Sequence, residues 1–337
     1  MVDVSIIIPL YNVEKYIENT INSILNQNFS GSYQVLLIDD GSTDNTFQIC
    51  NSFVNKCENI IYKKIDNNGV GNARNMGLSL ANSKYVCFID SDDTISDNYL
   101  QKLYDSIQDD CDLVVAGYKR INEFNNREVL KCISAKNYIK DDFCYLIPVL
   151  QNNNMFNQVW NKIFKLDIIK ENNLLFPTNI TYGEDFRFVV EYLEYTNRIN
   201  VIDDIIYYYV NRTNGLNLKY RKDRIYINLN NVFILEDFFV KNNYNKSSYD
   251  DYIDSKIFKT LISGICSIYE NPNKKSIRND LKDFLNCNEV ITKLNSYKNF
   301  KVNFILVFSK NGWILFDIFI CLMIFFKKLY KKIKLGY

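Results

Sequence analysis

The chain has 337 residues, of which 47% are hydrophobic, so it can form a sizeable core in two domains or in one domain with an extension. Its net charge of +1 creates no global field that would attract nucleic acid, so no nucleic-acid partner is expected. Histidine is absent, which excludes imidazole bases and imidazole metal ligands, so carboxylates, Cys, Lys, Tyr or water must carry such chemistry.

Residues 1–118 alternate between strand and helix patterns. Apolar runs of strand length occupy residues 4–10, 33–39, 59–65, 84–90 and 112–118. Apolar residues at helical spacing between these runs predict helices, the first of them starting at Val13 with Asn12 as its N-cap. This alternation predicts an α/β fold in which helices cover both faces of a mainly parallel sheet.

Polar residues follow four of the five predicted strands. They are Asn12 after the first, Asp39 and Asp40 at the second, the loop Asn67–Arg74 after the third, and Asp90, Asp92 and Asp93 at the fourth. Ligands of such sheets bind at the carboxyl ends of the strands. The four strand ends therefore predict a binding site.

The loop NNGVGNARNMG, Asn67 to Gly77, begins like a dinucleotide-binding fingerprint, with glycines at 69 and 71 and an acidic residue, Asp90, further on. However, Arg74 stands where the fingerprint needs a small residue, and the loop follows the third strand rather than the first. A guanidinium suits a phosphate. The loop favours phosphate binding, with an NAD-dependent oxidoreductase as the main alternative enzyme.

Three carboxylates, Asp90, Asp92 and Asp93, crowd the end of the fourth strand. Alone, they are typical of an Asp-rich turn that caps the next helix. Beside the acidic end of a neighbouring strand, they favour a hard divalent cation such as Mg²⁺ or Mn²⁺, which takes oxygen ligands and bridges to phosphates. A nicotinamide cofactor needs no such metal.

The sequence pattern divides the chain into three parts. The pattern predicts a catalytic domain over residues 1–218, a helical extension over 219–300 and a distinct C-terminal segment over 301–337. Residues 312–326, GWILFDIFICLMIFF, carry one charge, and the following KKLYKKIKLGY carries five lysines. This favours a helix lying on an anionic membrane surface over a buried core helix or a membrane span.

Cysteine usage and the N-terminus bear on location. Nine cysteines without a CxxC pair indicate reduced, buried thiols. The first twelve residues lack the positive region of a signal peptide. We expect a cytoplasmic protein, peripheral on the inner face of the cytoplasmic membrane.

Six segments carry a family resemblance: SIIIPLYN, LIDDGSTDNT, NNGVGNARNMGL, FIDSDD, VWNKIFK and YGEDFRF, in this order. Together they resemble the family 2 glycosyltransferases of the GT-A fold, over residues 4–215. The resemblance implies the GT-A nucleotide-diphospho-sugar transferase fold, a UDP-sugar donor, inversion at the transferred sugar, and Mn²⁺ or Mg²⁺ as cofactor.

The resemblance also implies roles for individual residues. The residues implied to bind the nucleotide-sugar are Pro9, Asn12, Asp40, Asn67, Asn68, Arg74, Asp90, Ser91, Asp92 and Arg212. Asp40 would accept a hydrogen bond from the uracil N–H. In the DxD motif, Asp90 would face the ribose, and Asp92, with Asp90 beside it, would bind the metal between the two phosphates. Arg212 would help to neutralise the leaving group.

The GED segment supplies the expected catalytic acids. The resemblance implies that Asp185 is the general base, with Glu184 as second choice; as bare sequence, the pair is also typical of a helix N-terminus. An acceptor hydroxyl must lose its proton as it attacks, and no histidine can take it. Trp160 and Lys162 in VWNKIFK fit either the acceptor side or simple packing with a surface charge.

The sequence thus predicts a metal-dependent inverting glycosyltransferase. It would move a sugar from a UDP-sugar onto a glycan or lipid-linked saccharide acceptor, in the synthesis of capsule or another cell-envelope polysaccharide. Besides the oxidoreductase, the alternative is a non-catalytic, membrane-bound sugar-nucleotide binder.

Overall fold

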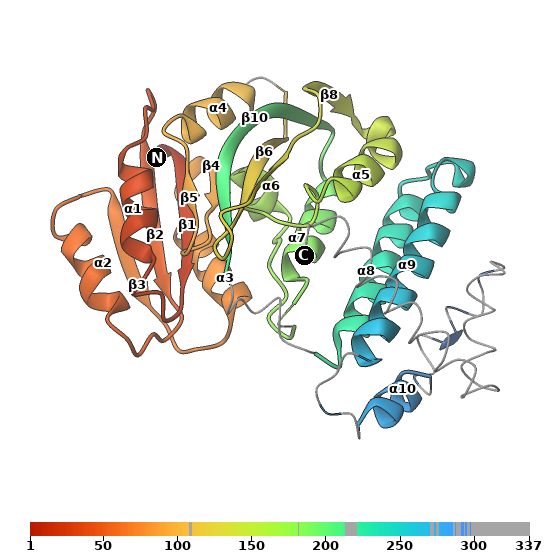
Figure 1. The fold of residues 1–337 in the computed structure, drawn as a ribbon. Helices are drawn as coiled ribbons and strands as arrows, with labels where there is room; N and C mark the ends of the chain where they lie inside the picture. Colours follow the sequence, from red (N-terminus) through yellow and green to blue (C-terminus); the bar gives the residue numbers. More distant parts are fainter. Residues whose placement is uncertain are drawn as a thin grey trace. The chain divides into compact units, whose positions relative to one another are not determined.

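The computed structural model describes residues 1–107, 110–180, 182–212, 221–269 and 276–285, together with residues 273, 287, 291, 292, 294 and 297. The chain divides into two compact units, residues 1–216 and 217–337. The first unit is α/β and the described part of the second is helical (Figure 1). The apolar and basic segment 312–337 lies outside the described residues.

A ten-stranded sheet forms the centre of the first unit, with the order β3-β2-β1-β4-β9-β6-β10-β5, while β7 pairs with β6 and β8 with β10. The strands are β1 (Val2–Leu10), β2 (Tyr33–Asp39), β3 (Ile60–Lys64), β4 (Ser83–Phe88), β5 (Thr94–Ile95), β6 (Leu113–Asn122), β7 (Glu128–Lys131), β8 (Lys136–Ile139), β9 (Lys162–Lys165) and β10 (Arg198–Asn211). Strands β1 to β4 pair in parallel, as do β6 and β10, whereas β9 runs antiparallel between β4 and β6. The predicted α/β fold with a mainly parallel sheet is confirmed.

Helices pack along this sheet (Figure 1). They are α1 (Ile17–Leu25), α2 (Thr46–Val54), α3 (Val70–Leu80), α4 (Tyr99–Ser106), α5 (Phe143–Asn152), α6 (Leu166–Glu171) and α7 (Glu184–Leu193), with a short 3₁₀ turn η1 (Lys140–Asp142) before α5. Helix α3 contacts β1 and β2. A Cβ added at Gly77 would lie 2.4 Å from Cγ2 of Ile7, so glycine lets α3 approach the sheet closely. This close packing fixes the loop that precedes α3.

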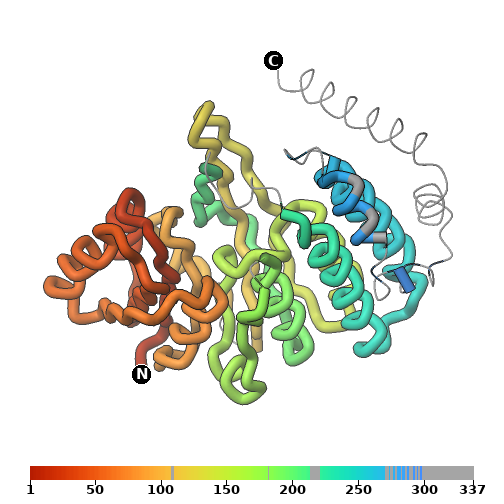
Figure 2. The backbone as a smooth tube through the Cα atoms, turned by 90° about the horizontal axis from the view of Figure 1, so that it is seen from below, coloured from red at the N-terminus to blue at the C-terminus, as the bar shows by residue number. Residues whose placement is uncertain are grey.

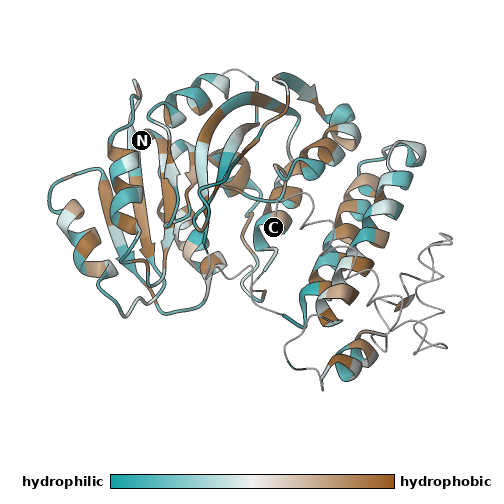
Figure 3. Cartoon of the chain, in the orientation of Figure 1, coloured by the Kyte–Doolittle hydropathy of each residue, from teal (hydrophilic) through white to brown (hydrophobic). Residues whose placement is uncertain are grey.

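The core lies in the strands that the sequence marks as continuous apolar runs. Residues 4–10 of β1 and 35–39 of β2 are all buried. These strands are coloured largely as hydrophobic in Figure 3. Strands that are buried on both faces need such runs rather than alternation, which explains why they were recognisable in the sequence.

Several predicted boundaries differ from the structure. Helix α1 begins at Ile17, not at Val13. Strand β4 ends at Phe88, so Asp90 stands beyond the strand. Strand β6 continues to Asn122 instead of ending at residue 118, so Tyr118 lies inside a strand that pairs with β7 and β10.

The second unit contains α8 (Arg224–Lys241), a 3₁₀ turn η3 (Lys246–Ser248), α9 (Asp250–Tyr269) and α10 (Ile277–Leu285). Helices α8 and α9 lie side by side (Figures 1 and 2). Each has buried apolar residues at helical spacing. Hydrophobic and hydrophilic residues alternate along both helices in Figure 3. Within the described ranges, no helix combines the length and apolar character needed to cross a membrane.

The cysteines are free thiols wherever the structure describes them. Four of them, Cys50, Cys87, Cys144 and Cys266, are buried, whereas Cys132 is exposed. The prediction of buried thiols is therefore correct only in part.

Candidate functional site

The carboxyl ends of β1 to β4 lie at one edge of the sheet, because these strands are parallel neighbours. Leu10 is paired with Asp39 on β2, and Asp39 in turn with Lys64 on β3. Pro9 is buried within β1 beside Ile38. This edge is where the sequence predicted a site.

Asn12 joins the loops that follow β1 and β2. Its backbone N–H donates to Ser42 Oγ over 3.0 Å, and its side-chain Oδ1 accepts from the N–H of Thr43 at 2.8 Å. Its φ of 52° lies in the left-handed region that Asn tolerates. The prediction that Asn12 caps α1 is wrong, because its side chain is committed to the neighbouring loop and Tyr16 occupies the N-cap position.

Asp40 organises the loop after β3. Its Oδ1 accepts from the N–H of Asn68 at 2.9 Å, and its Oδ2 accepts from the N–H of Gly69 at 2.8 Å. Asp40 is buried, while Asn67 and Asn68 are exposed at the loop surface. Each carboxylate oxygen has further acceptor capacity, so holding this loop leaves room for a ligand donor.

Two glycines give this loop its shape for different reasons. Gly69 precedes α3 with a φ of 91°, a conformation that other residues rarely adopt. A Cβ at Gly71 would come within 2.8 Å of the carbonyl oxygen of Pro177, so glycine is needed there for close packing. The pair that looked like a dinucleotide fingerprint is explained by the fold itself.

Arg74 lies at the centre of the site and is 3% exposed. Its Nη1 donates to Asp185 Oδ1 at 2.6 Å and to Glu184 Oε1 at 3.0 Å, while its Nη2 donates to Asp90 Oδ1 at 3.1 Å. Burial alone would lower the pKa of Arg74, but the charges of Asp185, Asp90 and Glu184 raise it overall. Arg74 therefore joins the DxD motif to the GED segment, two motifs that are far apart in the sequence.

The DxD motif, Asp90 to Asp92, forms a tight group of carboxylates with Asp93. Burial raises the pKa of Asp90; Arg74 opposes this rise and Asp92 adds to it. Burial also raises the pKa of Asp93, and the charges of Asp92 and Asp90 raise it further. Asp92 is the most exposed of the three, at 38%. The group carries mutually repelling negative charge that a cation would relieve.

Tyr207 on β10 is a site residue that the sequence did not reveal. Its hydroxyl donates to Asp93 Oδ2 at 2.9 Å and accepts from the N–H of Asp90 at 3.2 Å. Thr20 on α1 holds the same turn from another side, because its hydroxyl lies 3.0 Å from the carbonyl oxygen of Ser91 and 2.7 Å from that of Asp93. These contacts fix the backbone of the DxD motif.

Arg212, just beyond β10, reaches this motif. Its Nε donates to Asp92 Oδ2 at 3.0 Å, Nη1 donates to Glu123 Oε1 at 3.0 Å, and Nη2 donates to the carbonyl oxygen of Asp92. Its guanidinium carbon lies 3.8 Å from the ring centroid of Tyr16. The structure thus brings Arg212 to the site residues of the first unit.

Asp185 and Glu184 begin α7, directly after Gly183, whose φ of 82° makes the sharp entry to the helix. Asp185 is 21% exposed and Glu184 is 12% exposed. Burial raises the pKa of Asp185 well above its usual range, and Arg74 opposes this rise. A carboxylate with a raised pKa is a stronger base, which suits proton abstraction.

Lys162 lies near Asp185 but is fully buried, so the interpretation of a surface charge is wrong. Its Nζ donates to the carbonyl oxygens of Met155 and Gln158 over 2.8 and 2.6 Å. Burial lowers the pKa of Lys162, and the charge of Asp185 opposes this. Trp160 is likewise buried, in a stack on Tyr207 with ring centroids 4.3 Å apart.

The donor set of the DxD motif fits a hard divalent cation that is shared with a phosphate ligand. Within the described ranges, no group of three or more His, Cys, Asp or Glu residues is arranged to hold a metal ion alone. Asp90 and Asp92 each engage one carboxylate oxygen with an arginine. Mg²⁺ is typically held by one or two carboxylates with substrate phosphates completing its shell, and the carboxylates of Asp90 and Asp92 match that requirement.

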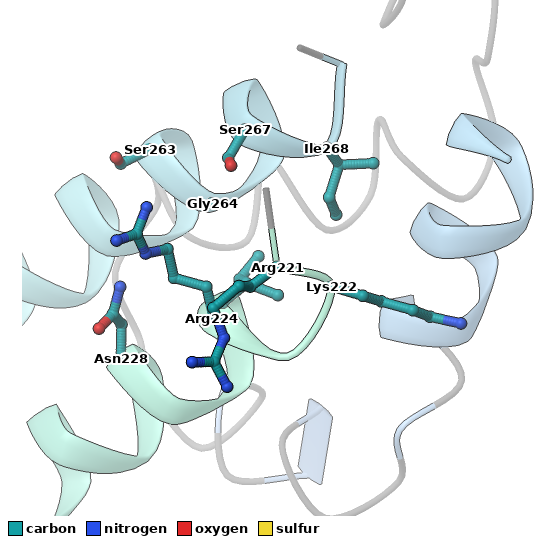
Figure 4. A pocket seen from close by; sticks show the side chains of 9 residues that line it. Arg221, Lys222, Arg224, Asn228, Ser263, Gly264, Ser267 and Ile268 are labelled. Atoms are coloured by element: carbon teal, nitrogen blue, oxygen red, sulfur yellow. The ribbon is translucent and has the colours of Figure 1, made fainter. Parts of the chain in front are cut away.

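The second unit has a pocket between α8 and α9 (Figure 4). It is lined by Arg221, Lys222, Arg224, Ile225, Asn228, Ser263, Gly264, Ser267 and Ile268. Arg221 pairs with Asp223 at 3.1 Å, and Lys222 pairs with Asp283 at 2.6 Å, so at least two of its cations are neutralised within the unit. The DxD motif and the GED segment both lie in the first unit.

Comparison with known proteins bears on the first unit. Residues 5–171 match the family model "Glycosyl transferase family 2". The chain is 31% identical over 216 residues to the poly(ribitol-phosphate) beta-glucosyltransferase of Bacillus spizizenii, which covers 63% of this chain and 33% of that protein. It is 30% identical over 219 residues to the poly(ribitol-phosphate) beta-N-acetylglucosaminyltransferase TarS of Staphylococcus aureus, covering 64% of this chain and 36% of TarS. The chain thus spans about a third of the length of these two relatives.

Solved structures agree on the fold. The crystal structure of S. aureus TarS 1-349 in complex with UDP-GlcNAc matches with a TM-score of 0.62 at 22% identity, covering 91% of this chain and 87% of that one. The TM-score for S. aureus TarS 1-349 in complex with UDP is 0.58 at 22% identity, over 86% of this chain and 82% of that one. These matches confirm the GT-A-like fold. Through the domain that contains the candidate site, this chain belongs to the family 2 glycosyltransferases.

Proposed function

We propose that this protein transfers a sugar, with inversion, from a UDP-sugar to a glycan or lipid-linked saccharide acceptor during synthesis of a cell-envelope polysaccharide. The observation that carries this proposal is the meeting of the DxD motif and the acidic start of α7 around Arg74. The carboxylates of the DxD motif are suited to binding a diphosphate through a cation. Those at the start of α7 are suited to removing a proton. The names of the relatives, which act on poly(ribitol-phosphate), support an envelope polymer as acceptor.

The loops at the strand ends would bind the donor. Asp40 keeps acceptor capacity for the uracil N–H, and the exposed amides of Asn67 and Asn68 lie in the loop that Asp40 holds. Asn12 fixes the neighbouring loop. A rigid loop cluster loses little entropy when the nucleotide binds.

Asp92 and Asp90 would hold Mn²⁺ or Mg²⁺ at the diphosphate. The bound ion would neutralise charge that develops on the departing UDP. Arg212 can exchange its contact with Asp92 for a contact with a phosphate oxygen, because a guanidinium forms strong hydrogen bonds to carboxylates and to phosphates.

Asp185 would remove the acceptor proton. The acceptor oxygen attacks the anomeric carbon, the bond from that carbon to the UDP oxygen breaks, and the proton passes to the Asp185 carboxylate. This single displacement inverts the configuration and needs no covalent sugar intermediate. Glu184, the preceding residue, is the second candidate for this base.

The proposal is tested with a panel of UDP-sugars. The full chain is incubated with each donor, with Mn²⁺ or Mg²⁺ and with a polyol-phosphate or saccharide acceptor, and released UDP is measured. We expect turnover of at least one donor that depends on the acceptor. Binding of UDP without any turnover would instead favour a non-catalytic binder, and quenching of NADH fluorescence without UDP binding would favour the oxidoreductase.

We further propose that the protein works at the inner face of the cytoplasmic membrane, where a lipid-linked acceptor would lie. The five lysines after the apolar residues 312–326 support attraction to anionic lipids. We expect the full chain to float with vesicles that contain anionic phosphatidylglycerol, and removal of residues 312–337 to abolish flotation. Equal flotation of both forms would contradict a role of this segment.

A further inference from the structure

Arg74 contacts three carboxylates, which come from two parts of the fold other than its own helix. Asp90 follows β4, Glu184 and Asp185 begin α7, and Arg74 itself lies on α3. The ring of Phe176 lies 5.3 Å from the guanidinium carbon. The side chain is therefore held from several sides and has little freedom to move toward a ligand.

Arg74 engages its two principal partners through one oxygen each. It binds Asp185 at Oδ1 and Asp90 at Oδ1. Among the described residues, no hydrogen bond engages Oδ2 of either carboxylate. One oxygen of each carboxylate is thus anchored by Arg74, and the other keeps its capacity to accept a hydrogen bond.

We propose that Arg74 is a positioning residue, which holds the base Asp185 at a fixed distance from Asp90 on the donor side. The base is then in place to take the acceptor proton while the sugar is transferred. This inference rests on the proposed function. Nη1 and Nη2 of one planar guanidinium hold the two carboxylates, and its rigidity fixes their separation. Lysine, with a single ammonium on a flexible stem, cannot reproduce this spacing.

The role differs from the phosphate contact that the sequence suggested for Arg74. A residue that contacts phosphate contributes to UDP affinity, whereas a residue that positions the base affects turnover. Three of the five N–H donors of Arg74 already serve carboxylates. Asp90 also keeps a separate anchor, because its backbone N–H donates to Tyr207. UDP binding should therefore survive changes at Arg74.

The test compares Arg74→Lys, Arg74→Gln, Asp185→Asn and the double variant Arg74→Gln/Asp185→Asn in the full chain. The turnover number is measured from UDP release at saturating donor and acceptor, the Kd of UDP by calorimetry, and folding by Tm. Lys165→Met serves as the control, because it removes an ion pair to Asp112 of 3.0 Å outside the site. Lys165→Met should lower Tm without lowering turnover.

We expect Arg74→Gln to lower turnover roughly 100-fold, the effect of misplacing a catalytic group by about 1 Å. Arg74→Lys should recover part of this loss. The Kd of UDP should stay within about threefold in both variants, because the backbone of Asp90 keeps its hydrogen bond to Tyr207. Since Arg74 acts through Asp185, the double variant should be no more than about threefold slower than Asp185→Asn alone.

Two results would overturn the positioning role. The first is normal turnover in both Arg74 variants. The second is a Kd of UDP at least tenfold weaker, with the loss from Arg74→Gln undiminished in the Asp185→Asn background. If Arg74→Gln fails to fold, Arg74→Lys decides the matter by the same two measurements. A wild-type chain that turns over no donor would instead remove the proposed function, and the positioning role with it.

Discussion

Replacement of Asp185 by Asn is expected to lower turnover by roughly 10³-fold, within the range that a positioned general base contributes. Asn has the same shape and can still accept from Arg74 Nη1 through its side-chain oxygen, so the α7 entry should remain folded. It cannot take a proton from the acceptor hydroxyl. UDP release at saturating donor and acceptor measures the loss, and calorimetry should show an unchanged Kd for UDP.

Glu184→Gln is the matched control for this prediction. Glu184 shares Nη1 of Arg74 with Asp185, at 3.0 Å, and is the next residue in the chain. If Asp185 is the base, Glu184→Gln should lower turnover by less than about tenfold, because it removes a neighbouring charge and leaves the base in place. A large loss in Glu184→Gln with near-normal turnover in Asp185→Asn would exchange the roles of the two carboxylates.

The sequence predicted the outline of the sheet because its central strands are continuous apolar runs. Strand β2 agrees with its prediction at both ends, since a tyrosine opens the run and an aspartate closes it. Strand β9 was not predicted as a strand. Its four residues, KIFK, contain two lysines, and the pairing with β4 and β6 that makes them a strand involves residues far away in the chain.

The location of the site was predictable, whereas its internal contacts were not. Parallel strands bring their carboxyl ends to one edge, so the polar residues after β1 to β4 had to lie near one another. The partners of Arg74 lie 16 and about 110 residues away in the chain, and only tertiary packing selects them. No local sequence pattern distinguishes an arginine that pairs with carboxylates of its own chain from one that binds a phosphate.

Tyr207 illustrates a second limit. It is the first of three consecutive tyrosines, and the sequence gives no reason to choose among them. Alternation along β10 puts Tyr207 and Tyr209 on one face, where both stack on Trp160. Only Tyr207 reaches the carboxylate of Asp93. Its role depends on its position along β10, which the sequence pattern does not indicate.

Asp92→Asn is expected to lower turnover by about 10²- to 10³-fold at a metal concentration that saturates the wild type, because the loss of one ligand weakens charge stabilisation worth several kcal/mol. Asp92 is the most exposed carboxylate of the motif, and Arg212 engages its Oδ2. Asn keeps the shape but offers a neutral oxygen, which a hard divalent cation binds weakly. Titration of Mn²⁺ against UDP release, after treatment with a chelator, should show half-maximal activity shifted upward by at least about tenfold.

Glu123→Gln distinguishes a metal-binding role of Asp92 from a role in holding Arg212. Glu123 accepts from Arg212 Nη1 at 3.0 Å but is not part of the DxD motif. If Asp92 acts through the metal, Glu123→Gln should leave the Mn²⁺ concentration for half-maximal activity unchanged, whatever it does to the contact with Arg212. If the two variants shift this concentration equally, Asp92 serves mainly to hold Arg212. If the wild type keeps full activity with a chelator present, the reaction needs no divalent cation, and protein cations such as Arg212 must neutralise the diphosphate.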